Sequence, residues 1–413
     1  MPKRDFTPAL LISFVILAII VCLVMFPHDG FQAALRGVSI WWDVLFPALF
    51  PFFVISEIML GFGIVHFFGT LLDPMMRPVF RIPGIGGFVM AMGFASGYPI
   101  GAKLTSQLWE QKLVNREEGE RLVAFTTSSD PIFLIGAVSI GFFHDASLAM
   151  ILAIAHYGGS LLIGLLMRFH GRKSIPTPAH SQTNQGWIGK RALETMHSAR
   201  IHDGRPIGML LSQSIIQSLR LIFVVGGLVV FFSVVLEILT SAQVMNVFYF
   251  LITSLLTFTG LPHELAQAVM NGLFEVTLGA KAAGGAPAEL ALASKVAIGA
   301  FILSWGGMSV HAQIVSLLSH TNLRYLPFLF ARLLHAMLSG AIVLLIWEPM
   351  QKFRSPQAVF KPVYEAASPI TSYLKLIFPI SAMVFVGSFA VIMSLFLAYS
   401  LLKLVYEKVG GTR

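Results

Sequence analysis

Small polar and acidic side chains interrupt long apolar stretches of this sequence, and the first interruption combines three hydroxyls, a carboxyl and a proline. It consists of Thr127, Ser128, Ser129, Asp130 and Pro131, within the apolar run 122–143. Such oxygens suit a hard cation such as Na⁺, or a polar substrate. The alternative is a proline kink whose freed carbonyls are satisfied by the hydroxyls. An ionisable residue inside an apolar run favours function, so Ser129 and Asp130 are candidates for binding a coupling ion.

A second interruption lies in the run 295–318, and a third acidic position lies before it. The interruption offers hydroxyls, an indole and a glycine as candidate substrate contacts, namely Ser304, Trp305, Gly306 and Ser309. Glu275 stands in a short apolar segment, Pro262–Lys281. A carboxylate there suits a coupling ion, a proton or the polar end of a substrate.

Two shorter segments are also broken at their centres, by Ser96, Gly97, Tyr98 and Pro99 in one and around Asn271 in the other. Proline lacks a donor and glycine is flexible, so regular helix should stop there. Broken helices leave free amides, and helix N-termini attract anions. The alternative is a glycine-rich contact between closely packed helices. Lys103 and Lys281 follow the breaks and suit either snorkelling to opposite interfaces or a pair of cationic gates for an anion.

These features recur in a way that indicates a duplicated unit. MGFASGYPIGAK (Met92–Lys103) is matched 178 residues later by MNGLFEVTLGAK (Met270–Lys281). The same separation carries Thr126–Pro131 onto Ser304–Ser309. Glu57 and Glu237 correspond at a separation of 180, and His156 and His335 at 179. We expect the two glutamates to pair with polar groups of neighbouring helices and the histidines, like His311, to pack within the bundle. Paired broken segments in two halves of a membrane protein point to a transport site.

Composition places the chain in a membrane. Its 413 residues are 56% hydrophobic and 12% charged, with a mean hydropathy of +0.79. Soluble domains of this size carry far more charge. The net charge of +8 comes from residues in loops, which is the pattern of membrane topology rather than of nucleic-acid binding. With one cysteine, Cys22, and no catalytic or P-loop motif, the sequence predicts no enzyme, no metal site and no cofactor beyond a coupling Na⁺ or proton.

The apolar runs predict an all-α polytopic membrane protein. About eight runs reach the ~20 residues that span a bilayer; they are 7–26, 44–64, 122–143, 148–169, 215–239, 295–318, 325–347 and 376–402. Segments 85–108 and 262–281 are too broken to cross, so we interpret them as re-entrant helical hairpins. Segment 65–83 is interpreted as an interfacial helix interrupted at its prolines, and segment 243–260 as an interfacial or kinked helix.

The distribution of Lys and Arg along the sequence predicts the orientation of the chain in the membrane. Lys3 and Arg4 precede the first run, and no cleavage site follows it, so we expect a retained first helix with a cytoplasmic N-terminus. Both termini and the basic loop then fall inside, and the second repeat is inverted relative to the first. The predicted organisation is 1–43, first helix and interfacial segment; 44–169, first repeat; 170–213, cytoplasmic basic loop; 214–347, inverted second repeat; 348–375, external loop; 376–413, last helix and tail.

The longest motifs resemble a known family. WWDVLFPALFPFFVISE, RIPGIGGFVMAMGFASGYPIGAKL and RLVAFTTSSDPIFLIGAVSIGFF resemble the YlbJ family of sporulation integral membrane proteins, which carry the nucleoside-recognition Gate domain. That family is similar in plan to concentrative nucleoside transporters, which hold substrate between hairpin tips and broken helices. By this similarity Ser96–Lys103, Ser128–Asp130, Asn271–Glu275 and Ser304–Ser309 would line a site. The carriers' Asn-Glu-Phe-Val-Ala signature is absent; Asn271–Val276 (NGLFEV) is a distant echo of it.

The resemblance implies transport of dipicolinic acid across the outer forespore membrane during endospore formation. Dipicolinate is a small planar dianion, which helix N-termini, hydroxyls, a lysine and an aromatic ring such as that of Tyr98 or Trp305 would suit. Two alternatives stay open: uptake of a nucleoside or base, and a scaffold without transport that recruits spore-envelope proteins through the loop Arg168–Gln213. The sequence also leaves open whether the chain forms a homo-oligomer in the lipid bilayer.

Overall fold

The computed structural model describes residues 6–178 and 188–351, which form helices joined by short connections and include no β-strand. Four helices in this part are long and apolar enough to cross a membrane, or six if two bent pairs each count as one span. This agrees with the predicted all-α membrane protein. The total of eight spans stays a prediction, and its last span, 376–402, lies outside the described residues.

Twelve helical elements follow one another in the described residues 6–167. They are α1 (Phe6–Met25), α2 (Pro27–Ser39), the π-helix η1 (Ile40–Leu45), α3 (Phe46–Gly61), α4 (Ile64–Phe80), α5 (Ile85–Ser96), α6 (Tyr98–Glu110), α7 (Arg116–Thr126), the π-helix η2 (Ile132–Phe142), α8 (Leu148–Ala153), the π-helix η3 (Ile154–Gly158) and α9 (Gly159–Met167). The polar region 170–213 contains a further helix, α10 (Ile188–Asp203), which packs against α4.

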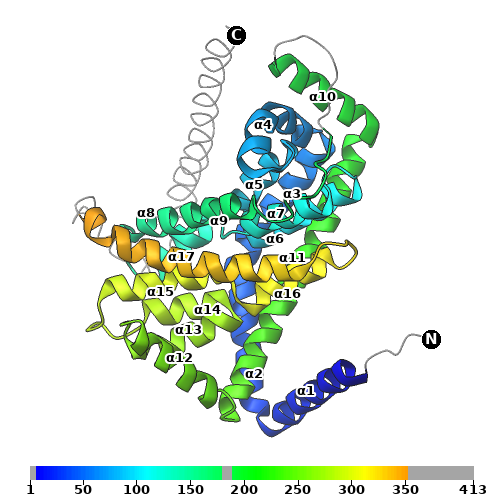
Figure 1. Ribbon diagram of the computed structural model, residues 1–413. Helices are drawn as coiled ribbons and strands as arrows, with labels where there is room; N and C mark the ends of the chain where they lie inside the picture. The colour runs from blue at the N-terminus through cyan, green and yellow to red at the C-terminus, as the bar shows by residue number, and fades with distance from the viewer. Residues whose placement is uncertain (1–5, 179–187, 352–413) are drawn as a thin grey trace, which may run out of the picture.

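The second half repeats the alternation of long and short helices. It contains α11 (Ile207–Ser241), α12 (Asn246–Phe258), the 3-10 helix η4 (His263–Leu265), α13 (Ala266–Phe274), α14 (Val276–Gly284), α15 (Leu292–Trp305), α16 (Gly307–Leu318) and α17 (Tyr325–Gln351). Figure 1 shows α17 crossing the middle of the molecule beside α9, with α12 to α15 on one side of it and α3 to α7 on the other.

A long helical stretch runs beside α11. The elements α2, η1 and α3 follow one another without a break over residues 27–61, and α2 and α3 both pack against α11. The interfacial segment expected at the end of residues 1–43 is therefore part of this stretch. One of its two tryptophans, Trp41, donates its indole N–H to the carbonyl of Ile222 on α11 at 3.0 Å.

The prediction of an interrupted helix over 65–83 was wrong. One helix, α4, runs through Pro74 and Pro78. Each proline removes one backbone hydrogen bond. Packing of α5 and α10 against α4, and an ion pair one turn apart between Asp73 and Arg77 at 2.7 Å, support the helix across these positions. Tertiary contacts thus outweigh the local tendency of the two prolines to end the helix.

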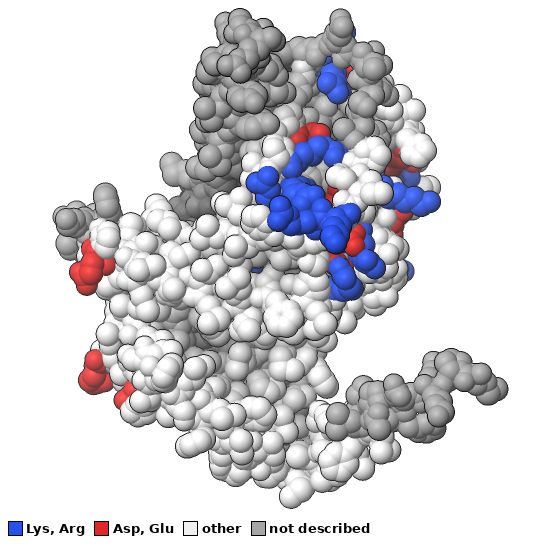
Figure 2. Space-filling view, in the orientation of Figure 1, with Lys and Arg blue, Asp and Glu red and all other residues white. Residues whose placement is uncertain are grey.

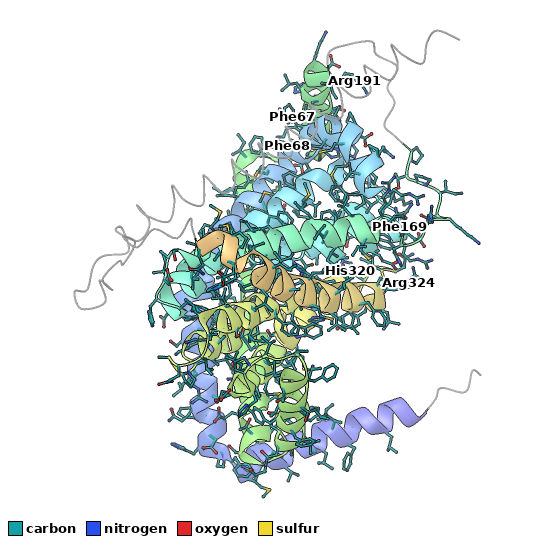
Figure 3. All side chains as sticks on the ribbon, turned by 60° about the vertical axis from the view of Figure 1, so that its left-hand side comes forward. Phe67, Phe68, Phe169, Arg191, His320 and Arg324 are labelled. Carbon is teal, nitrogen blue, oxygen red and sulfur yellow. The ribbon has the colours of Figure 1, made fainter. Side chains whose placement is uncertain are left out.

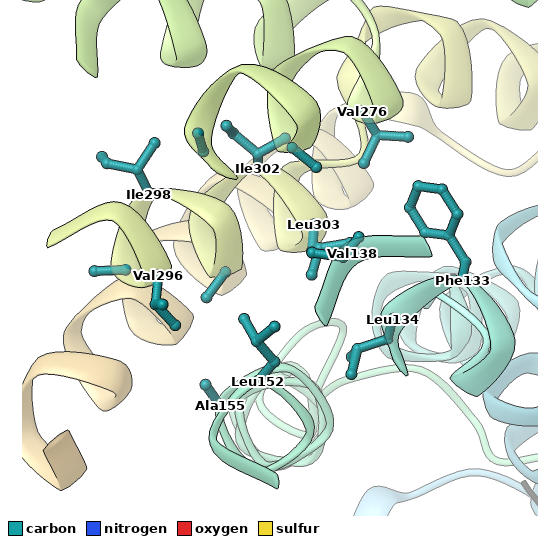
Figure 4. Close-up of a cluster of buried hydrophobic side chains, with 14 of the residues drawn as sticks. Phe133, Leu134, Val138, Leu152, Ala155, Val276, Val296, Ile298, Ile302 and Leu303 are labelled. Atoms are coloured by element: carbon teal, nitrogen blue, oxygen red, sulfur yellow. The ribbon is translucent and has the colours of Figure 1, made fainter. Parts of the chain in front are cut away.

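The largest buried apolar cluster joins the two halves. Phe133, Leu134 and Val138 of η2 pack with Val276 of α14 and with a row of α15 side chains, and α8 and η3 close the cluster from the other side (Figure 4). The π-helix that follows the first break is therefore held by the second half of the chain. This packing positions both breaks next to each other.

A buried carboxylate also ties the halves together at one end of α17. Glu120, on α7, is 3% exposed and accepts hydrogen bonds from Arg324 Nε and Nη2, both at 2.8 Å, and from the Arg324 backbone N–H at 2.9 Å. His170 Nε2 lies 2.6 Å from its second oxygen. Burial by itself would raise the pKa of this carboxyl, but the hydrogen bonds from Arg324 and His170 outweigh it and hold the pKa below the ordinary value of 4.5.

Replacing Glu120 by glutamine is expected to destabilise the protein near neutral pH by about 1–2 kcal/mol, a value that allows for solvent screening at Arg324. A lowered folded-state pKa contributes stability above the unfolded value and loses it as pH falls through the folded value. The difference in unfolding temperature between wild type and E120Q in detergent should therefore shrink below pH ~4.5. Glu264→Gln, at an exposed carboxyl beside His263, is the control and should change little. If the difference in unfolding temperature between wild type and E120Q did not change with pH, a stabilising role for the negative charge of Glu120 would be contradicted.

Candidate functional site

The first short helix pair meets at a glycine that touches the first break. α5 ends at Ser96, α6 begins at Tyr98, and Gly97 between them has φ +88° and ψ 179°, a conformation that only glycine adopts readily. A Cβ atom on Gly97 would lie 3.0 Å from Asp130 Oδ2. The tip of this pair, which we call tip 1 (Ser96–Pro99), therefore packs directly on Asp130.

Residues 127–130, which we call break 1, have no helical structure between α7 and η2. The hydroxyls of Thr126 and Thr127 donate to the carbonyls one turn earlier, at 2.7 and 2.8 Å, so these two side chains satisfy the helix end. Asp130 Oδ1 accepts the backbone N–H of Phe133 at 2.8 Å and caps the half-helix that follows. The interpretation of hydroxyls that satisfy freed carbonyls is thus confirmed for Thr126 and Thr127, and ion or substrate binding at Ser128–Asp130 stays a prediction.

The second half of the chain repeats this arrangement. Glu275, in an extended conformation between α13 and α14, accepts the backbone N–H of Leu278 at 2.8 Å. We call Asn271–Thr277 tip 2, and Gly306–Ser309 break 2. A Cβ atom on Gly307 would lie 3.0 Å from the Glu275 Cα, so tip 2 packs on break 2. Each half of the chain therefore has one buried carboxylate that caps a half-helix, Asp130 in break 1 and Glu275 in tip 2.

His156 connects break 1 with α15. Its Nε2 lies 2.9 Å from Ser128 Oγ and accepts the backbone N–H of Ser129 at 3.0 Å. Its Nδ1 lies 2.8 Å from the hydroxyl of Ser304. Ser304 in turn donates to Ser339 at 2.7 Å, and Ser339 donates to the carbonyl of residue 155 at 3.0 Å.

The repeat-related histidines lie together, with ring centroids 5.1 Å apart. His335 Nε2 lies 2.8 Å from the carbonyl oxygen of His156, and this oxygen only accepts, so Nε2 carries the proton. His335 Nδ1 faces Arg332 Nη1 at 3.0 Å and must accept. By the same argument His156 Nε2 accepts from Ser129 and its proton is on Nδ1. Each histidine is therefore held as one neutral tautomer.

Arg332 of α17 lies in the middle of this cluster, fully buried at 0% exposure. Its Nη1 donates to the carbonyl of Thr127 at 2.6 Å, in break 1. Its Nε and Nη2 have no hydrogen-bond partner, and no carboxylate forms an ion pair with it among residues 6–178 and 188–351. A buried guanidinium with free donors is costly unless an anion completes it.

Three further buried polar atoms near the tips and breaks also lack a partner in the described part of the chain: Ser96 Oγ in tip 1, Thr277 Oγ1 in tip 2 and Ser309 Oγ in break 2. Tyr98 links the two halves, since its hydroxyl donates to the carbonyl of Leu303 at 2.7 Å. Unsatisfied groups therefore occur in both halves, and Tyr98 and Arg332 connect the two halves at tip 1 and break 1.

Other predicted residues lie elsewhere or play different parts. Lys103 forms an ion pair with Glu57 at 2.5 Å, and Gln107 donates to the same carboxylate at 3.2 Å, so this lysine is engaged by α3. Glu237 pairs with Arg36 at 2.5 Å, and Lys281 is exposed. Trp305 donates to the carbonyl of Leu273, and its ring centroid lies 4.2 Å from that of His311, with the two ring planes tilted by 34°. Asn271 is partly exposed, and Pro99 is buried in the first turn of α6.

This region is closed to solvent. Ser96, Ser128, Ser129, Ser304 and Arg332 have 0% exposure, and Glu275 and Ser309 have 1%. An anion that met Arg332 here would be fully dehydrated. Sequence reasoning did not select Arg332 or Ser339; for Arg332 the signal was present, because an ionisable side chain stood in an apolar run.

Comparison with known proteins gives two matches. A family model described as "Gate: Nucleoside recognition" matches residues 43–173, which include tip 1, break 1 and His156 but not Arg332. The chain is 43% identical over 341 residues to the sporulation integral membrane protein YlbJ of Bacillus subtilis (strain 168), and the match covers 83% of each chain. No solved structure matches the chain.

Proposed function

This chain belongs to the family of the sporulation integral membrane protein YlbJ, and on that premise we propose that it is a membrane transporter of a small organic dianion, dipicolinate by its family resemblance. Its membrane would be the outer forespore membrane, with both termini in the mother-cell cytoplasm. The proposal rests on one observation above the others: the buried guanidinium of Arg332, which has two unpartnered nitrogens and no acidic partner in the described chain.

The unpartnered Nε and Nη2 of Arg332 form one edge of the guanidinium. That edge presents two parallel N–H donors, which match the two oxygens of a carboxylate. Nη1 on the other side is already used by Thr127 and His335, so the side chain is held in place before any ligand arrives. A preorganised donor pair loses little entropy on binding.

A second carboxylate of the same ligand has candidate partners in the orphan hydroxyls Ser96, Thr277 and Ser309. The first turn of α6, directly after Gly97, adds a helix N-terminus, which favours negative charge. Tyr98, at that helix start, supplies an aromatic face for a flat ring. These groups together suit a planar aromatic dicarboxylate better than a neutral solute.

Charge balance favours coupling to a cation. Asp130 and Glu275 are buried carboxyls with no ion pair in the described part of the chain, and a dianion would meet one fixed positive charge at Arg332. Net negative charge in a dehydrated site is costly, so one or two protons or Na⁺ ions should accompany the substrate. Asp130, with the oxygens of Ser129, and Glu275 are the positions we propose for them.

The paired tips and breaks support alternating access. Tip 1 packs on break 1, tip 2 packs on break 2, and a network through His156 and Ser304 joins the pairs. Two hairpins in inverted repeats could open the site to one side at a time around a fixed midplane. The closed region described above would then be the occluded state of the cycle.

The test is uptake of radiolabelled dipicolinate into proteoliposomes that contain the purified chain, with imposed proton or Na⁺ gradients. Saturable uptake that follows one gradient is the expected result and would name the coupling ion. Empty liposomes and liposomes that contain an unrelated membrane protein are the controls. Absence of saturable uptake by folded protein, inserted in both orientations, would overturn the proposal and favour a scaffold that acts through 168–213.

A nucleoside or base is the second candidate substrate, because the matching family model is described as nucleoside recognition. Competition experiments in the same proteoliposomes distinguish dipicolinate from a nucleoside or base as the substrate. Excess unlabelled uridine or adenosine should leave dipicolinate uptake unchanged if the dianion is the substrate. Competition by a nucleoside, together with direct uptake of labelled uridine, would reverse the assignment.

A further inference from the structure

A groove of about 680 Å³ lies between α9 and α17, on the side of α17 away from the buried site. Apolar side chains from both helices line it: Ile163, Leu166, Met167, Leu326, Phe330 and Leu334. Four of these six are among the exposed large hydrophobic residues, including Phe330 at 65%. In an integral membrane protein such a surface is accessible to acyl chains.

One end of the groove is basic. His170 and Arg324 lie there beside Tyr325, where α9 has just ended and α17 begins. Figure 3 shows Phe169 and Arg324 at the same end of these two helices. Arg168, Arg172 and Lys173 are exposed in the connection that follows α9. Figure 2 shows Lys and Arg side chains gathered on this face, next to a surface of uncharged residues.

The acidic partner in this region is hidden behind the basic ones. The Glu120 side chain is 1% exposed, whereas that of Arg324 is 50% exposed. Arg324 uses Nε and Nη2 for Glu120 and has no recorded partner for Nη1 in the described chain. A molecule in the groove would therefore meet positive charge at this end and apolar side chains along the rest.

We propose that an anionic phospholipid occupies this groove, with its phosphate at Arg324 and His170 and its acyl chains along α9 and α17. Arginine is suited to phosphate by charge and by its several donors. The basic end coincides with the helix ends, which is the depth at which headgroups lie, and Tyr325 stands there as an interfacial aromatic residue. Basic pockets between membrane helices are known to hold anionic headgroups.

This site adjoins the buried arginine through one helix. Ala331 lines the groove, and the next residue, Arg332, points into the closed region. A bound lipid would restrain α17 on its outer face while the inner face holds Arg332. The lipid should therefore stabilise the protein whether or not a transport substrate is present, so this inference is independent of the proposed substrate.

The experiment measures the thermal unfolding temperature of the full chain in detergent after addition of phosphatidylglycerol or phosphatidylcholine, with native mass spectrometry to count retained lipids. We expect phosphatidylglycerol to raise the unfolding temperature and to be retained, with phosphatidylcholine clearly weaker. Inorganic phosphate alone should have no effect, because the acyl chains contribute the apolar contacts. An equal response to both lipids, or a full response to inorganic phosphate, would overturn the proposal.

Two variants test the site itself. Leu334→Trp fills the groove and leaves the Arg324–Glu120 pair intact, and it should abolish the preference for phosphatidylglycerol. Leu345→Trp, on the same helix at a position 77% exposed and outside the groove, is the matched control and should keep it. Arg324→Gln should weaken phosphatidylglycerol binding about tenfold by loss of a charged hydrogen bond to phosphate. Unchanged lipid preference in folded L334W protein would contradict the assignment.

Discussion

Replacing Arg332 by glutamine is expected to abolish saturable dipicolinate uptake. The substitution keeps a polar side chain, but it removes the charge, the two-donor edge and the Nη1 group that donates to the carbonyl of Thr127. Loss of a pair of charged hydrogen bonds should weaken binding by about 100-fold or more. Arg332→Lys keeps the positive charge but lacks the edge with two parallel N–H donors, so it should retain weak uptake with a higher KM.

The controls for this prediction separate binding from folding. Lys190→Gln, at an exposed position on α10, should leave uptake unchanged. Removing a buried charge that lacks its anion should not lower stability, so the unfolding temperature of R332Q without substrate should match or exceed that of wild type. Dipicolinate should raise the unfolding temperature of wild type but not of R332Q. Normal uptake by R332Q would exclude Arg332 as the anion ligand.

Replacing Gly97 by alanine is expected to have the second largest effect. A side chain at φ +88° and ψ 179° is strained by about 1–3 kcal/mol. The added methyl would also press on Asp130 Oδ2, at 3.0 Å, and on Leu49 Cδ2, at 3.2 Å. Tip 1 must then shift away from break 1, so uptake should fall by at least about tenfold even where the protein folds.

A glycine outside the site provides the comparison for Gly97. Gly227 lies within the helix α11, and a Cβ atom there would meet nothing within 4 Å. Gly227→Ala should leave uptake unchanged and raise helix stability slightly, by up to about 1 kcal/mol. Uptake and unfolding temperature are measured for both variants in the same preparation. Equal behaviour of G97A and G227A would show that the conformation of tip 1 is unimportant.

The helical breaks were predictable because their causes are local. Glycine, proline and clustered hydroxyls within a few residues of one another weaken a helix locally, and α7 and α15 end where such residues stand. The repeat offsets also placed His156 and His335 in correspondence, but not in contact. Contact depends on how η3 and α17 pack, which no local pattern encodes.

Arg332 shows where the sequence interpretation stopped short. Its apolar neighbours make α17 one long uninterrupted run, so nothing marked the position as a break. Lys103 is the opposite case: its place after tip 1 suggested a gate, but Glu57 on a distant helix neutralises it. Whether a buried charge is free or paired is decided by tertiary partners, and this pairing distinguishes a ligand site from a structural ion pair.

The fixed tautomers of His156 and His335 constrain how protons could move through the protein. From the Ser129 amide through His156, Ser304 and Ser339 to the carbonyl of residue 155, every hydrogen points in the same direction. Passing a proton along such a chain would reverse each bond, yet an amide N–H at one end and a carbonyl at the other cannot reverse. This hydrogen-bonded chain through His156 therefore does not conduct protons from one end to the other. A transporter coupled to protons would have to carry them on Asp130 or Glu275, and the histidines would block their leakage across the closed state.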